Sequence, residues 1–211
     1  MASLRRVLPY RATAVAKILK RSKEEAAIGR AAAAARRVMV ASSTRKVVVA
    51  SDRSCDVFLS HRGVDTKKSL AGLLYDRLVE MNVKPFLDNR SMQPGDKLYE
   101  CIDAGIRQSK VGVAIFSPRY CDSVFCLHEL AMMVESQKKL IPVFCDVKPS
   151  ELLVKDAAAY SPEDLNRYMK AIQEAKLTVG LTFDSKNGNW SNLVSRTAKI
   201  VLKCMKDERD R

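Results

Sequence analysis

Residues 110–117 read KVGVAIFS, a run of small and β-branched apolar side chains that Pro118 closes. A short apolar run of this kind, ended by a residue that interrupts a β-ladder, is typical of a strand buried on both faces of a sheet. Four similar runs predict four more strands: CDVFLS (55–60), KPFLD (84–88), KLIPVFCDV (139–147) and LTVGLTF (177–183). The stretch 110–117 is thus the third of five predicted strands.

Between these strands, large apolar side chains recur at intervals of three and four residues. This spacing predicts helices around residues 70–81, 98–106, 127–134 and 190–204. Strands that alternate with helices form a parallel sheet with helices on both faces. Because the crossovers of such sheets are right-handed, we expect a flavodoxin-like three-layer α/β sandwich with a five-stranded parallel sheet in the order 2-1-3-4-5.

The predicted strand order also indicates where to look for a ligand site. The chain reverses direction between the first and third strands, and ligands of such sheets bind beyond the carboxyl ends of the strands at that point. Residues 60–65 close the first strand and residues 117–129 follow the third. Residues 88–96, after the second strand, can reach over the same edge.

The positive charge of the chain lies in its N-terminal quarter. The 211 residues carry a formal net charge of +13, and residues 1–54 hold thirteen Lys and Arg against three acids. That segment has a net charge of +10, which leaves +3 for the rest. We therefore expect no specific nucleic-acid partner for the folded part. No run of about 18 apolar residues occurs, so we expect no transmembrane segment.

Composition divides the chain into three parts. We expect residues 1–54 to be a basic, disordered extension, residues 55–206 to be the folded domain, and residues 207–211 to be a charged tail. The Arg- and Ala-rich start also has the style of an organelle transit peptide, although Glu24 and Glu25 weigh against that. We expect a cytoplasmic location, with organelle targeting as the alternative.

The chain has six cysteines and no Cys-x-x-Cys pair. Cys55 and Cys145 lie inside apolar runs, as is typical of reduced thiols in an intracellular protein. A zinc site at Cys121, Cys126 and His128 is the alternative, but their spacing matches no usual zinc pattern. We therefore expect no metal.

Arg62 and Gly63 stand where the first strand ends. A guanidinium suits a phosphate group, and a glycine lets a ligand approach the backbone closely. The same pair also fits a surface arginine beside a turn glycine. The chain has no G-x-G-x-x-G and no Walker motif, so neither a hydride-transfer site nor a P-loop is supported.

Glu129 is the other candidate at this edge. On a helical projection it lies nearly opposite the stripe that contains Leu127 and Leu130, beside Phe125 and Met132. A glutamate at such a position is commonly solvated. A carboxylate between an aromatic ring and a Met also resembles half of an open pocket, in which partial burial raises the carboxyl pKa.

Three blocks of sequence, in order, resemble the signature blocks of plant TIR domains. They are CDVFLSHRGVDTKKSLAGLLYDRL (55–78), FLDNRSMQPGDKLYECIDAGIRQSKVGVAIFSPRYCDSVFCLHEL (86–130) and LIPVFCDVKPSEL (140–152). The resemblance covers residues 55–206, and the chain is similar to TIR-only proteins.

Many plant TIR domains cleave NAD+, and the resemblance places their catalytic glutamate at Glu129. It also implies substrate contacts from Arg62, Gly63, Ser123 and Phe125. NAD+ is then the substrate, and no cofactor is expected. The chemistry suits a carboxylate, because cleavage of the nicotinamide–ribose bond passes through an oxocarbenium-like state.

The resemblance further implies self-association through TIR–TIR contacts, with other TIR proteins as further partners. In the family the loop at 88–96 docks on a neighbouring protomer, which makes Asp88, Pro94 and Gly95 the expected assembly residues. Gly72 and Leu73 replace a Ser-His pair that many plant TIR domains use for self-association.

Three residues at the site depart from the usual family pattern. His61 replaces a Phe, Val64 replaces an acidic residue, and Phe125 stands where Trp is frequent. His61 could be a base, or a packed or exposed substitute for the Phe.

Two functions follow from these observations. The first is an NAD+ hydrolase and cyclase that yields nicotinamide with ADP-ribose or a cyclic isomer, in plant immune and cell-death signalling. The alternative is a non-catalytic adaptor that acts through TIR–TIR binding. Glu129 together with Arg62 favours the enzyme. A response-regulator receiver is disfavoured, because the first strand does not end in an acidic cluster.

Overall fold

The computed structural model describes residues 55–66 and 69–207. Five strands form one sheet: β1 (Val57–His61), β2 (Pro85–Phe86), β3 (Val111–Phe116), β4 (Lys139–Cys145) and β5 (Leu181–Phe183). Their order is β2-β1-β3-β4-β5, and every neighbouring pair is parallel. The predicted fold class and strand order are confirmed.

The central strand β3 explains why the sheet is buried on both faces. All six of its residues are buried, and Val113 pairs with Leu59 of β1 and Ile141 of β4. Val113 and its odd-numbered neighbours belong to one hydrophobic cluster, while Ala114 and Phe116 belong to the other. Alternate side chains of β3 thus pack into two separate hydrophobic cores, one on each face of the sheet.

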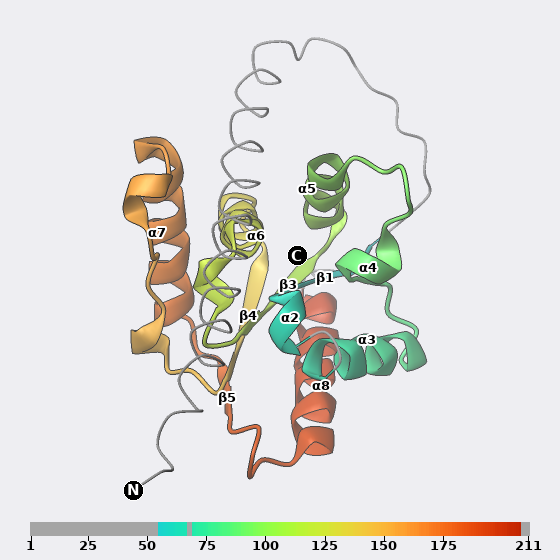
Figure 1. The fold of residues 1–211 in the computed structure, drawn as a ribbon. Helices are drawn as coiled ribbons and strands as arrows, with labels where there is room; N and C mark the ends of the chain where they lie inside the picture. Colours follow the sequence, from blue (N-terminus) through green and yellow to red (C-terminus); the bar gives the residue numbers. More distant parts are fainter. Residues whose placement is uncertain (1–54, 67–68, 208–211) are drawn as a thin grey trace, which may run out of the picture. The chain divides into compact units, whose positions relative to one another are not determined.

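Helices cover both faces of the sheet (Figure 1). One core holds α5 (Leu98–Gln108), α6 (Val124–Glu135) and α7 (Pro162–Leu177). The other holds α3 (Leu70–Glu80) and α8 (Trp190–Asp207). These bounds confirm the four predicted helices.

Helix α7 was not among the predicted helices. Its buried residues are Tyr168, Ala171, Ile172 and Ala175, so its apolar face contains a single large aliphatic side chain. Ser161 caps its N-terminus by accepting a hydrogen bond from the Asp164 backbone N–H at 3.1 Å. A face built mostly of alanine and one aromatic ring gives a weak periodic signal in the sequence.

The remaining elements are short. They are α2 (Gly63–Thr66), α4 (Asp88–Ser91) and the 3-10 turns η1 (Tyr120–Asp122), η2 (Pro149–Glu151) and η3 (Ala157–Ala159). Asp207 lies in α8, one residue beyond the predicted end of the domain. The predicted extension at 1–54 and residues 208–211 lie outside the described residues.

The segment 88–96, expected to be a loop, begins with a helical turn. In α4, Ser91 Oγ accepts a hydrogen bond from the Leu87 backbone N–H at 2.9 Å, and Leu87 is buried. Arg90 joins α4 to α3 through an ion pair with Asp76 and a contact 4.6 Å above the Tyr75 ring. The first half of the segment is therefore anchored to the fold.

No helix within residues 55–66 and 69–207 is long and apolar enough to cross a bilayer.

The side chains of the suggested zinc site have other partners. Cys126 Sγ donates to the His61 carbonyl oxygen at 3.4 Å, and His128 Nε2 lies 2.8 Å from Asp103 Oδ1. Among the described residues, no three His, Cys, Asp or Glu side chains are arranged to hold a metal ion.

Candidate active site

The loops after β1 and β3 meet at the carboxyl edge of the sheet, where the Asp65 carboxylate joins them. Ser117 Oγ donates to Asp65 Oδ2 at 2.8 Å, and Arg119 forms an ion pair with Asp65 Oδ1. Arg62 directly follows β1, and Gly63 is the first residue of α2. The structure therefore places both predicted residues at the predicted switch point.

Helix α6 enters the same edge from the β3 side. Ser123 caps it by accepting a hydrogen bond from the Cys126 backbone N–H at 3.4 Å. Asp122, the residue before it, ends η1 and forms an ion pair with Lys155 at 2.8 Å. Ser123 is thus next to the site, and its hydroxyl oxygen already serves the helix N-terminus.

Glu129 is buried, with only 8% of its surface exposed. Of the two interpretations of the sequence, the solvated glutamate is therefore excluded, and the burial is more complete than a half-open pocket implies. Helix α6 is buried on nearly all sides, from Cys126 through Met133, because it packs on the sheet and also contacts α5 and α7. It lies close to the sheet at Gly112, where a Cβ atom would stand 2.3 Å from the Met133 sulfur.

The Glu129 carboxyl is held by a buried hydrogen-bonded chain. Ser60 Oγ lies 2.7 Å from Glu129 Oε2, to which it donates when the carboxyl is ionised, and 2.6 Å from the Tyr120 hydroxyl. The Tyr120 hydroxyl also donates to the Cys126 carbonyl oxygen at 3.1 Å. The chain links β1, η1 and α6, which lie far apart in sequence.

Burial changes the acidity of this group. Loss of hydration raises the pKa of Glu129 from 4.5 to about 8, the Ser60 hydrogen bond opposes the rise, and the negative charge of Asp88 adds to it. Burial also raises the pKa of Tyr120 well above its usual value. A carboxyl whose pKa is near neutral pH is common at catalytic sites.

His61, the last residue of β1, is packed. Its Nδ1 lies 3.2 Å from Thr66 Oγ1, and its Nε2 lies 3.8 Å from Asp88 Oδ1. The side chain is 2% exposed, and Nε2 makes no hydrogen bond. Asp88 therefore reaches the candidate site, whereas Pro94 and Gly95 are exposed further along their segment.

Phe125 is half-buried and packs against α5. Its ring centroid lies 5.5 Å from that of Tyr99, and the edge of Tyr99 also contacts His128 at 5.3 Å. Phe125 lies in the first turn of α6. Its ring packs against Tyr99 of α5 rather than against the Glu129 carboxyl. Tyr99 was not among the predicted site residues.

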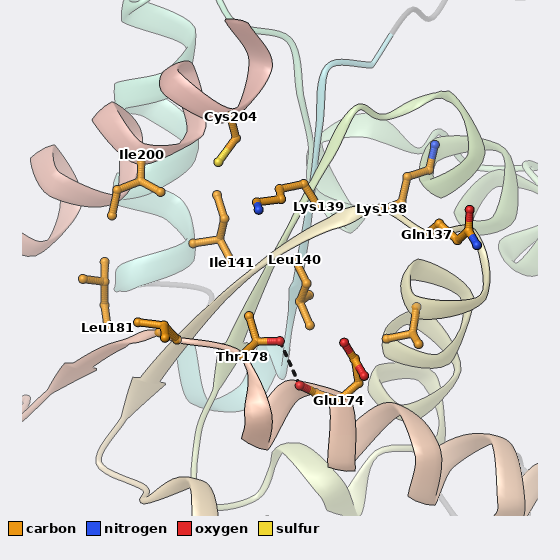
Figure 2. A pocket seen from close by; sticks show the side chains of 13 residues that line it. Gln137, Lys138, Lys139, Leu140, Ile141, Glu174, Thr178, Leu181, Ile200 and Cys204 are labelled. Carbon is orange, nitrogen blue, oxygen red and sulfur yellow. Dashed lines mark hydrogen bonds between the residues drawn. The ribbon is translucent and has the colours of Figure 1, made fainter. Parts of the chain in front are cut away.

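A hollow of about 730 Å³ lies at the opposite, amino end of the sheet (Figure 2). Ile200 and Cys204 of α8 extend toward Ile141 of β4, and Lys139 stands beside them. A second hollow, of about 340 Å³, lies between α6 and α7. Neither hollow is lined by any predicted site residue.

The match to known families agrees with this geometry. Residues 57–179 match the TIR domain family model. The chain belongs to the TIR domain family. It is 55% identical over 151 residues to "Probable 2' cyclic ADP-D-ribose synthase BdTIR" of Brachypodium distachyon, an alignment that covers 70% of this chain and 67% of that protein.

Longer plant proteins share the domain. TMV resistance protein N of Nicotiana glutinosa is 35% identical over 103 residues, which are 47% of this chain and 9% of that protein. The TIR domains of the activated Roq1 resistosome match with a TM-score of 0.59 and 28% identity, covering 70% of this chain and 99% of that one. This TIR domain thus spans only a small part of the resistance proteins it matches.

Ser60 and Tyr120 are the site residues that sequence reasoning missed. A serine near the end of the apolar run CDVFLS is a polar group in a buried strand, which was the available signal. Tyr120 gave no such signal, because its partner lies 60 residues away and only the pairing of β1 with β3 brings them together.

Proposed function

We propose that this TIR domain cleaves the bond between nicotinamide and ribose in NAD+. The products are nicotinamide with either ADP-ribose or one of the cyclic ADP-ribose isomers. The observation that carries the proposal is Glu129, a buried carboxyl held by Ser60 at the switch point of the sheet. The 55% identity of the chain to a Brachypodium protein named as a probable cyclic ADP-D-ribose synthase supports the same chemistry.

Glu129 stabilises the transition state in this proposal. As nicotinamide leaves, positive charge develops on the ribose, and a nearby carboxylate lowers the energy of that cation. The effect is larger in a buried site, where water does not screen the charges. Nicotinamide leaves as a neutral molecule from a substrate that is already cationic, so the reaction needs no cofactor.

The surrounding residues bind the rest of NAD+. The Arg62 guanidinium is suited to the diphosphate, and Gly63 leaves the backbone accessible beside it. Phe125, which packs at a tilt against Tyr99, offers an aromatic surface to a flat ring at the start of α6. Ser123 lies next to that surface as the N-cap of the helix.

The nature of the nucleophile decides the product. Attack by water on the ribose cation gives ADP-ribose. Attack by a hydroxyl or by the adenine of the same molecule gives a cyclic isomer. A site that excludes water favours the second outcome, because the internal nucleophile is then the nearer one.

Self-association switches this activity on in our proposal. The related Roq1 TIR domains come from an activated resistosome. In this chain, α4 is anchored by Arg90, while Pro94 and Gly95 are exposed at the tip of the segment 88–96. That tip is available to a neighbouring protomer, and its contact would act on the site through Asp88, which lies 3.8 Å from His61.

Gly95→Arg tests the assembly step, with two matched controls. Gly95 has a φ of +99°, so any side chain strains the backbone there. Gly95→Ala introduces that strain without bulk, and Gln93→Arg adds a bulky charge to the same exposed segment without it. We expect Gly95→Arg and Gln93→Arg to lower specific activity and to abolish its rise with protein concentration, measured from nanomolar to high micromolar. Specific activity that is constant over this range in the unaltered protein contradicts assembly-dependent activation.

The biological setting follows from the relatives. Several are named as disease resistance proteins of plants, which supports a role in immune and cell-death signalling with other TIR proteins as partners. NAD+ is abundant in the cytoplasm, and we propose that location. A fluorescent fusion of the full chain, viewed in plant cells, tests it against an organelle.

The direct test is to incubate the purified protein with NAD+ and identify the products by mass spectrometry. The proposal predicts free nicotinamide and either ADP-ribose or a cyclic ADP-ribose, whose mass is lower than that of ADP-ribose by one water. A protein that self-associates but releases no nicotinamide at any concentration is instead a TIR adaptor.

A further inference from the structure

In the buried series of hydrogen bonds at Glu129, the direction of each bond depends on whether the carboxyl carries a proton. Three oxygen contacts run in series: Glu129 Oε2 to Ser60 Oγ at 2.7 Å, Ser60 Oγ to the Tyr120 hydroxyl at 2.6 Å, and that hydroxyl to the Cys126 carbonyl at 3.1 Å. Ser60 and Tyr120 are both 0% exposed. Their hydroxyls must therefore be satisfied by protein partners.

Each contact needs one proton, and the far end of the chain fixes their direction. A carbonyl oxygen only accepts, so the proton of the third contact must come from Tyr120. The second contact must then use the Ser60 proton. No hydroxyl proton is left for the first contact, so it must come from the Glu129 carboxyl. All three hydrogen bonds exist together only when that carboxyl is protonated.

An ionised Glu129 reverses the chain. Ser60 then donates to the carboxylate, and Tyr120 donates to Ser60, so the contact with the Cys126 carbonyl loses its proton. Two hydrogen bonds remain in place of three, although the bond to the carboxylate is the stronger kind. The two proton arrangements use the same atoms in the same positions and differ only in direction.

We propose that Tyr120, linked to Glu129 through Ser60, is a positioning residue that keeps the carboxyl neutral and turned toward β1 until substrate binds, and that Ser60 stabilises the carboxylate that then forms. This inference rests on the proposed function, because it assigns the state of the group that acts on NAD+. Binding of the cationic nicotinamide–ribose favours the carboxylate. The carboxyl proton then passes to the solvent, and the two hydroxyls reverse their donors to stabilise the new charge.

Other charged and titratable groups surround the chain and act on the same balance. The Asp88 carboxylate of α4 opposes ionisation of Glu129, and the positive charge of Arg62 offsets only part of the rise that burial causes in the pKa of the neighbouring Cys126 thiol. The Cys126 thiol itself is neutral, because burial raises its pKa. His61, at the end of β1, lies 3.8 Å from Asp88.

Removing each hydroxyl has an opposite expected effect. Tyr120→Phe keeps the ring, which packs edge-on to Phe116 at 4.6 Å, and removes two hydrogen bonds from the neutral chain but one from the ionised chain. The pKa of Glu129 should fall by about half a unit to one unit. Ser60→Ala removes two hydrogen bonds from either arrangement, but those lost from the ionised chain include the stronger bond to the carboxylate, so the pKa should rise by about one unit.

Carbon-13 NMR of the full chain, labelled at glutamate side-chain carboxyls, measures this titration without any catalysis. The Glu129 signal is assigned by its absence in Glu129→Gln. Ser109→Ala is the matched control, because Ser109 is also buried and its hydroxyl bonds a carbonyl, that of Ile106 at 2.8 Å, before β3 begins. It should leave the Glu129 titration unchanged.

The expected result is a midpoint of about 8 in the unaltered protein, with shifts in opposite directions in the two variants. A midpoint near 4.5 in the unaltered protein overturns the inference. This measurement does not depend on whether the Ser60 and Tyr120 variants fold. Shifts in the same direction, or no shift in either variant, overturn the positioning role. A protein that shows the expected titration but does not cleave NAD+ would refute the proposed function and leave the proton chain intact.

Discussion

The two ends of the sheet differ in what they bury. At the carboxyl end, Ser60, Tyr120 and Glu129 are enclosed and joined by hydrogen bonds, and the carboxyl has a raised pKa. At the amino end, an open hollow of about 730 Å³ is lined by apolar side chains of β4 and α8 and by the exposed Lys139 (Figure 2).

A large hollow is the usual first guide to a ligand site, yet here it lies at the end without enclosed acid–base groups. Burial of a carboxyl opposes folding unless partners compensate, so a fold that retains one has a use for it. Under the proposed function, the raised pKa of Glu129 at the switch point marks the active site, and the open hollow does not.

The largest expected effect comes from removing the acid itself. Glu129→Gln should lower kcat for NAD+ cleavage by at least about 100-fold, because the neutral amide cannot stabilise a developing cation. Glu174→Gln, in the hollow at the amino end, is the control and should have unchanged activity. Comparable losses of kcat in the two variants would contradict the assignment of catalysis to the carboxyl end of the sheet. Circular dichroism and the Tm establish that both variants fold.

Arg62→Ala should raise KM by about 10-fold and change kcat less, since the guanidinium binds phosphate in both the ground state and the transition state. Arg196→Ala on the exposed side of α8 removes the same charge far from the site and should change neither constant. An unchanged KM in Arg62→Ala would contradict a binding role at the carboxyl end.

The buried carboxyl also predicts a pH dependence of stability. Because the pKa of Glu129 is about 8 in the folded state and 4.5 in the reference state, the folded protein holds an extra proton between these values. The contribution of Glu129 to stability is therefore fully present below pH 4.5 and is lost as pH rises through about 8.

Glu129→Gln should lack this loss, so its Tm should rise relative to the unaltered protein by on the order of 3 °C per pH unit across that window. Thermal denaturation at pH 5, 7 and 9 measures the difference. A Tm difference that is constant with pH would show that Glu129 ionises normally.

The smallest effect should come from the other end. Lys139→Ala should change kcat and KM by less than about 2-fold, because Lys139 is exposed at the start of β4 and no part of the carboxyl edge depends on it. Steady-state kinetics with NAD+ is the measurement. A loss of 10-fold or more would assign substrate binding to the hollow.

The sequence predicted the sheet well and the local burial poorly. Short apolar runs such as that of β3 are strong signals, and chain connectivity then leaves few strand orders. The position of Glu129 was predictable from its spacing on α6. Its burial was not, because Cys126 and His128 on the other sides of that helix are enclosed by neighbours that a helical projection does not contain.

Similar reasons explain the other differences. Helix α7 was missed because alanines provide much of its buried face, and α4 was missed because a single turn has no period to detect. The chain from Glu129 to Tyr120 joins three elements across the β1–β3 pairing. Contacts of that kind depend on tertiary structure.

The most direct test of the central claim is to locate NAD+ on the folded protein. Glu129→Gln labelled with nitrogen-15 should bind NAD+ without consuming it, and amide chemical shifts report where. The account predicts changes at Arg62, Gly63, Ser117 and Phe125, at the carboxyl end of the sheet. Changes confined to Lys139, Gly180 and Cys204 would contradict it and place the substrate in the hollow at the amino end.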